Sequence, residues 1–124
     1  MQLIPGSERD EYWFHEGCHI TEWSNSPADE ALSIARARVA PGQTTRWHKL
    51  AGTTERYVIL EGRGRAEAGD EILEATPGDV VIIAPGQPQR ITNTGARDLV
   101  FLAICTPRFR RKNYTEIPKM ETPS

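Results

Sequence analysis

Short segments rich in apolar and β-branched residues alternate along the chain with turn residues. Glycine, proline, asparagine and aspartate mark the turns, as at 41–42, 77–79 and 85–88. Few of the intervals between turns are long enough for a helix. The pattern predicts about eight strands, at 18–23, 32–40, 55–60, 63–68, 72–75, 80–83, 89–92 and 99–106.

Short strands at such regular spacing are typical of an all-β sandwich or barrel. The segment 66–72, with Gly69-Asp70 at its centre, predicts a tight hairpin. A parallel α/β sheet is excluded because the chain has no room for crossover helices.

The strands differ in how many faces they should bury. Segment 33–39 alternates, which predicts a half-buried strand with Arg36 and Arg38 on one face. The runs 80–84 and 99–104 are continuously apolar, which predicts cover on both faces. The second cover is either the other sheet of the sandwich or a second subunit, so a homodimer is one expectation.

Length and composition fit one globular domain. The chain has 124 residues, 26% of them charged, and a formal net charge of −2. The apolar runs are far shorter than the ~20 residues of a membrane span, and the acidic balance argues against nucleic acid as a partner. The first ten residues lack the features of a secretory signal, so we expect a cytoplasmic protein with two buried thiols, Cys18 and Cys105.

Charge is unevenly distributed. Residues 1–30 carry seven acidic side chains and one arginine, whereas residues 106–124 carry five basic and two acidic ones. The two ends either attract one another, within or between chains, or remain solvated.

The candidate chemistry begins at His48. If His48 points into a barrel, so does Leu50, and after the turn at 51–54 the side chains of Glu55 and Tyr57 share one face of the next strand. A hairpin of this kind would bring an imidazole and a carboxylate within reach of one atom.

This stretch resembles the first motif of the cupin family, G-x5-H-x-H-x3,4-E-x6-G, and residues 78–93 resemble the second, G-x5-P-x-G-x2-H-x3-N. The matching positions are Gly42, His48, Glu55 and Gly62 in the first motif, and Gly78, Gly86 and Asn93 in the second. The resemblance implies a double-stranded jelly-roll β-barrel with an interior pocket. We expect one structural domain, with an N-terminal arm and first strands at 1–30, the barrel at 31–107 and a basic C-terminal tail at 108–124.

The departures from the motifs concern the metal ligands. Cupins that bind a metal typically use three histidines and one glutamate, but here Leu50 and Gln89 stand where two of the histidines would be, and Ala84 replaces the motif's proline. The resemblance implies a weakly held divalent ion, Fe, Mn, Ni, Zn or Cu, on His48, Glu55 and Gln89. The alternatives are a metal-free pocket, or a His48–Glu55 pair that merely satisfies its own hydrogen bonds.

Other residues are weaker candidates. Arg36 and Arg38 either reach into the barrel to clamp a carboxylate or phosphate, or face solvent. Tyr57 either orients a ligand or packs in the core. Cys18 and His19 would supply further ligands if the N-terminal strand folds over the barrel mouth.

Two functions follow. The first is an enzyme for a small polar metabolite, of dioxygenase, isomerase or lyase type, in which a metal polarises an oxygen and His48 and Glu55 are the catalytic groups. The second is a metal-free cupin that binds or senses a small molecule.

Overall fold

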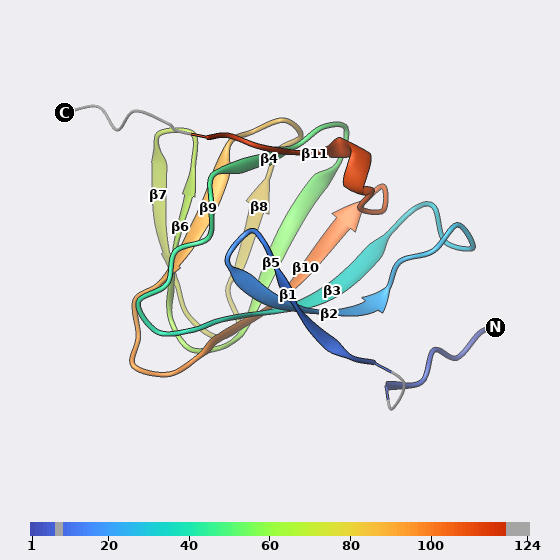
Figure 1. Ribbon diagram of the computed structural model, residues 1–124, viewed down its shortest axis with the longest axis horizontal. Helices are drawn as coiled ribbons and strands as arrows, with labels where there is room; N and C mark the ends of the chain where they lie inside the picture. The colour runs from blue at the N-terminus through green and yellow to red at the C-terminus, as the bar shows by residue number, and fades with distance from the viewer. Residues whose placement is uncertain (7–8, 119–124) are drawn as a thin grey trace.

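Two antiparallel sheets face one another in the computed structural model, which describes residues 1–6 and 9–118 (Figure 1). The first sheet has the strand order β1-β2-β3-β10-β5-β8, and the second has the order β11-β4-β9-β6-β7. The strands of the first sheet are β1 Glu11–Phe14, β2 Cys18–Ser24, β3 Ser33–Val39, β10 Leu99–Thr106, β5 Thr54–Glu61 and β8 Val80–Ile83. Those of the second are β11 Tyr114–Glu116, β4 His48–Leu50, β9 Gln89–Asn93, β6 Gly64–Ala68 and β7 Glu71–Ala75.

This arrangement is a jelly roll, and the predicted fold class is confirmed. Each of the eight predicted segments is a strand, and the structure adds β1, β4 and β11. A short 3₁₀ turn, Arg111–Asn113, lies between β10 and β11. No helix in the described part of the chain has the length and apolar character that crossing a membrane requires.

The predicted hairpin joins β6 to β7. Ala68 pairs with Glu71, and the two residues between them form the turn. Gly69 has a φ of +61°, which the first central residue of a type II′ turn requires and which glycine adopts without strain.

Alternation along each strand sends every second side chain into the barrel interior. Position along the strands then separates two ends of that interior. Toward one end, Val39, Ile59, Ile91 and Leu99 are at most 1% exposed. We call these four residues the apolar end. Burial of one such side chain contributes about 1.5–3 kcal/mol.

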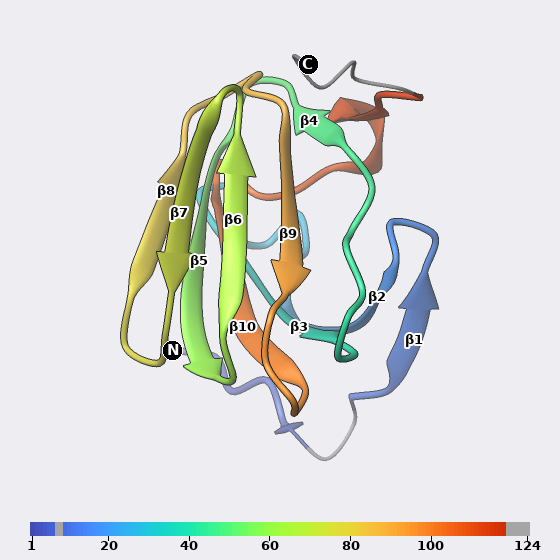
Figure 2. The same ribbon diagram turned by 90° about the vertical axis from the view of Figure 1, so that its left-hand side faces the viewer.

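The two continuous apolar runs behave differently. β10 lies between β3 and β5 in the centre of its sheet (Figure 2), and its inner face is buried. β8 is an edge strand whose Val80 and Ile82 are 54% and 69% exposed on the outer face. Nothing within residues 1–6 and 9–118 covers that face, and the homodimer stays a prediction.

The C-terminal region contributes to the barrel. β11, at residues 114–116, pairs with β4 and closes one side of the second sheet, although it falls within the segment expected to be a basic tail. Residues 119–124 of that segment lie outside the described residues. The oppositely charged ends do attract one another within the chain, because Arg108 and Arg110 both bind Glu30.

Candidate functional site

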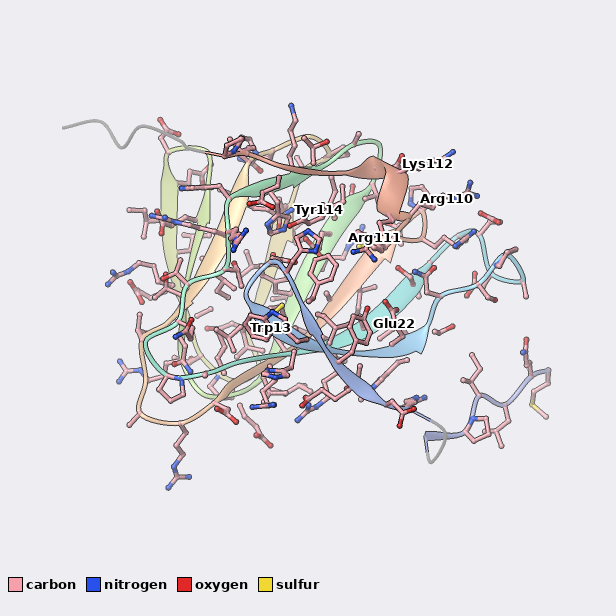
Figure 3. All side chains as sticks on the ribbon, in the orientation of Figure 1. Trp13, Glu22, Arg110, Arg111, Lys112 and Tyr114 are labelled. Atoms are coloured by element: carbon pink, nitrogen blue, oxygen red, sulfur yellow. The ribbon has the colours of Figure 1, made fainter. Side chains whose placement is uncertain are left out.

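His48 lies inside the barrel and is bonded through both ring nitrogens. Its Nδ1 lies 2.8 Å from the carbonyl oxygen of Arg46, and its Nε2 lies 3.2 Å from Oε1 of Glu16. The ring also stacks on Tyr114, with centroids 5.2 Å apart and planes at 19° (Figure 3 labels Tyr114). These contacts fix the imidazole in one orientation.

Glu16, which the sequence analysis did not single out, reaches His48 from the turn between β1 and β2. Gly17 makes this turn possible with a φ of +108°. The backbone N–H of Arg46 donates to the Glu16 carbonyl at 2.7 Å, which holds the turn against the segment leading into β4. The β1–β2 hairpin thus places a carboxyl group beside the imidazole, and no motif spacing indicates this long-range contact.

The contact between Glu16 and His48 allows two protonation states. A carbonyl oxygen only accepts, so Nδ1 of His48 carries a hydrogen. Nε2 then either accepts from a protonated Glu16 or donates, as imidazolium, to an ionised one. Burial raises the pKa of Glu16 to about 8 and lowers the pKa of His48. Both shifts favour the neutral pair, in which the Glu16 carboxyl donates to the imidazole.

Glu55, on β5, has an incomplete set of partners. Its side chain is buried, Oε2 lies 3.9 Å from the Cys105 thiol, and Oε1 has no hydrogen-bond partner. Burial raises the pKa of Glu55 to about 7, with Glu16 adding to the shift and His48 opposing it. A buried carboxyl oxygen without a partner costs about 1–3 kcal/mol or more, which indicates a group kept for a ligand.

Gln89 and Tyr57 bond to one another. The two residues lie on β9 and β5, and the Tyr57 hydroxyl donates to Oε1 of Gln89. The side chains of both residues also lie near the Glu55 carboxyl group and lower its pKa, against the larger effect of burial. The predicted trio of His48, Glu55 and Gln89 is therefore gathered inside one end of the barrel, which we call the polar end.

A pocket opens beside Glu55 and offers about 60 Å³ to the centres of water molecules. A single water needs about 10–15 Å³ by this measure, so the pocket has room for a small organic group. Its walls are mostly apolar. They comprise Tyr12, Phe14, Glu16, Ile20, Glu22, Ala35, Glu55, Ala103, Cys105 and Phe109.

The other predicted pocket residues lie elsewhere. Leu50 and Tyr57 are buried but do not line this pocket. Arg36 and Arg38 occupy the face of β3 opposite the buried Ala37 and bind Glu11, and Arg38 also binds Asp98. Of the two alternatives for these arginines, the structure shows the outward-facing one, and their prediction as pocket residues does not hold because their guanidinium groups pair with these carboxylates.

The N-terminal strands do fold over the barrel, as the Cys18 and His19 hypothesis required. Cys18 is buried, and burial raises the pKa of its thiol, which keeps it protonated. His19 packs edge-on against Trp13 at 5.0 Å, away from the pocket.

The donors present do not fit a resident metal ion. Within residues 1–6 and 9–118, no three side chains of His, Cys, Asp and Glu are grouped as metal ligands. Both ring nitrogens of His48 have hydrogen-bond partners, the Arg46 carbonyl and Glu16, and the Gln89 oxygen accepts a hydrogen bond from Tyr57. Of the predicted ligands, only Glu55 has an oxygen without a partner.

Comparison with known proteins defines the class. The sequence model of the cupin domain matches residues 35–105, more than half of the chain. The chain belongs to the cupin family, and the resemblance identified from the two motifs is confirmed.

Individual relatives agree with this. The chain is 38% identical over 85 residues to the uncharacterized protein MJ1618 of Methanocaldococcus jannaschii, a match covering 68% of this chain and 67% of that protein. It is 36% identical over 76 residues to the oxalate-binding protein of Thermotoga maritima, covering 61% and 63%. The fold is also similar to that of Pac13, a nucleoside dehydratase from Streptomyces, with a TM-score of 0.80, 14% identity and coverage of 94% and 91%.

Proposed function

We propose that the chain binds a small organic molecule in the pocket beside Glu55, without a metal ion. The observation that carries the proposal is the unpartnered Oε1 of Glu55, a buried polar atom on the wall of an otherwise mostly apolar pocket. Small-molecule sites commonly combine apolar walls with a few polar groups that fix orientation.

Oxalate does not suit this pocket, although the Thermotoga maritima relative is named for binding it. The pocket walls contain three glutamates and no lysine, arginine or histidine. A dianion placed there would meet carboxyl groups and no positive charge, which is unfavourable in a desolvated site.

A second candidate is catalysis of a proton transfer in the same pocket. Nε2 of His48 lies 3.2 Å from Oε1 of Glu16, and the raised pKa of Glu55, about 7, places its titration near neutrality. A general acid or base works best with a pKa near the operating pH. In this candidate Glu55 exchanges a proton with the ligand, and Glu16 and His48 balance the local charge.

The test combines metal analysis with native mass spectrometry. Protein purified without chelator should contain no stoichiometric metal, and neither EDTA nor Fe, Mn, Ni, Zn or Cu salts should shift its melting temperature. A small organic molecule should co-purify with the wild type and be lost in Glu55→Gln. The matched control Arg65→Gln changes an exposed ion pair with Glu74 and should retain the molecule.

Stoichiometric metal that EDTA removes with a drop in melting temperature would refute the metal-free site and support His48, Glu55 and Gln89 as ligands. If wild type and Glu55→Gln retain the same molecule equally, the pocket assignment is wrong.

A further inference from the structure

Acidic groups line the pocket both in the barrel interior and near its entrance. Glu16 and Glu55 lie inside the barrel, and Glu22 lies near the entrance, where it accepts a hydrogen bond from the Tyr12 hydroxyl at 3.2 Å. Burial raises the pKa of all three carboxyl groups. Burial makes it costly to ionise these carboxyl groups, and no cationic side chain on the pocket wall offsets this cost.

Nearby basic residues do not neutralise Glu55. His48 directs its two nitrogens to the Arg46 carbonyl and to Glu16. Arg111 lies over the Phe14 ring, 5.5 Å from its centroid, but is exposed and outside the pocket lining (Figure 3). Glu55 is at least nine-tenths buried, with 8% exposed, and its Oε1 has no hydrogen-bond partner of suitable geometry, although Gln89 and Tyr57 lie near enough to lower the pKa of the carboxyl group.

Aromatic rings line the pocket together with the carboxyl groups. Tyr12, Phe14 and Phe109 contribute three rings to a lining that is otherwise aliphatic, carboxylic or thiol. The face of an aromatic ring attracts a cation through its quadrupole, most strongly where water is excluded. Rings beside carboxylates are the combination that recognises an ammonium group, whereas an anion would be repelled by both.

We propose that the ligand carries a small organic cation, a protonated amine or a quaternary ammonium, which Glu55 anchors and the rings of Tyr12, Phe14 and Phe109 enclose. This inference rests on the proposed function and names its ligand class. A protonated amine donates a hydrogen bond to Oε1, whereas a quaternary ammonium pairs with the carboxylate by charge alone, and either one stabilises the ionised carboxylate.

The pocket volume limits the size of the buried group. About 60 Å³ of space for water centres corresponds to on the order of five waters. Tetramethylammonium, with five non-hydrogen atoms, is a suitable probe. Its neutral counterpart of similar shape is tert-butanol, and a small anion for comparison is propionate.

The experiment measures binding of these three probes, and of propylammonium as a protonated amine, to the full chain at pH 7.5 by calorimetry and by NMR shifts of pocket residues such as Ala103. Tetramethylammonium and propylammonium should bind with shifts centred on the pocket. tert-Butanol should bind at least about tenfold more weakly, because its hydroxyl can donate a hydrogen bond to the carboxylate but carries no positive charge to pair with it, and propionate should not bind.

Two variants locate the cation. Glu55→Gln keeps the shape and should weaken tetramethylammonium binding by about tenfold or more. Ala103→Leu fills the pocket and should abolish binding without changing charge, whereas Arg65→Gln should leave it unchanged. Circular dichroism and melting curves establish that each variant is folded.

The outcomes separate the two proposals. If tert-butanol or propionate binds as well as the ammonium probes, or if the co-purifying molecule is neutral or anionic, the cation inference is wrong while the small-molecule pocket stands. If Glu55→Gln binds tetramethylammonium as tightly as the wild type, Glu55 is not the anchor. If no probe shifts pocket signals and no molecule co-purifies, both proposals fail.

Discussion

The apolar and polar ends of the barrel are built from the same strands and are almost equally buried, yet they differ in chemistry. β5 contributes Glu55 to one end and Ile59 to the other, and β9 contributes Gln89 and Ile91. At the apolar end the four side chains carry no polar atom and belong to the hydrophobic core. At the polar end Glu55 keeps an oxygen without a partner beside a pocket. Burial alone therefore does not separate core from site, whereas the satisfaction of polar atoms does.

The largest effect is expected at the apolar end. Leu99→Ala should lower the free energy of unfolding by about 2–5 kcal/mol, because Leu99 is fully buried and its removal leaves a cavity. Urea denaturation measures this loss. The variant should still bind tetramethylammonium under conditions where it is folded. A loss below about 1 kcal/mol would mean that the apolar end is not close-packed.

Glu55 should give the polar end its own pH dependence. The pKa of Glu55 is raised in the folded state to about 7 from its ordinary 4.5, so the folded state binds more protons than the unfolded state between these values. The Glu55 carboxyl therefore lowers the stability progressively as pH rises from about 4.5 to 7. Relative to Glu55→Gln, the wild type should lose about 3 kcal/mol between pH 4 and pH 8.

Urea denaturation of both proteins across this pH range measures the difference. Glu16 titrates in both proteins, so its contribution largely cancels. A difference that does not change with pH would show that Glu55 titrates normally and that the polar end is hydrated.

Removing Glu16 should have a smaller effect. Glu16→Ala leaves Nε2 of the buried His48 without its partner, which should cost about 1–3 kcal/mol at pH 6, where Glu16 is protonated. NMR of the His48 ring should show a higher imidazole pKa or new water access. Unchanged stability together with an unchanged His48 spectrum would contradict the Glu16–His48 hydrogen bond.

The outer surface should contribute least. Arg38→Gln removes half-exposed ion pairs to Glu11 and Asp98 and should cost about 0–1 kcal/mol. It should leave tetramethylammonium binding unchanged, since Arg38 lies on the outer face. A clear loss of binding would place Arg38 in contact with the pocket after all.

Much of the barrel could be predicted because strand alternation and turn residues are local. The faces of β5, with Glu55, Tyr57 and Ile59 together, follow from the same alternation. β4 and β11 are only three residues long and too short for a pattern to mark.

The site was predicted only in part. Its gathering around His48, Glu55 and Gln89 follows from the two motifs, but the bonds do not. The Tyr57 hydroxyl donates a hydrogen bond to the oxygen of Gln89. Glu16 contacts Nε2 of His48 from a hairpin about 30 residues earlier in the chain. The alternation of 33–39 does not show whether Arg36 and Arg38 point inward or outward. Their outward orientation depends on ion pairs with Glu11 of β1, which is distant in the sequence.

The origin of the pocket walls has an evolutionary consequence. Half of them, Tyr12, Phe14, Glu16, Ile20 and Glu22, come from the β1–β2 hairpin, which precedes the region 35–105 shared with the family. Exchange of this one exposed module could retarget the barrel to a new compound while its framework stays constant. Half of the lining of this pocket therefore lies outside the segment by which the family is recognised.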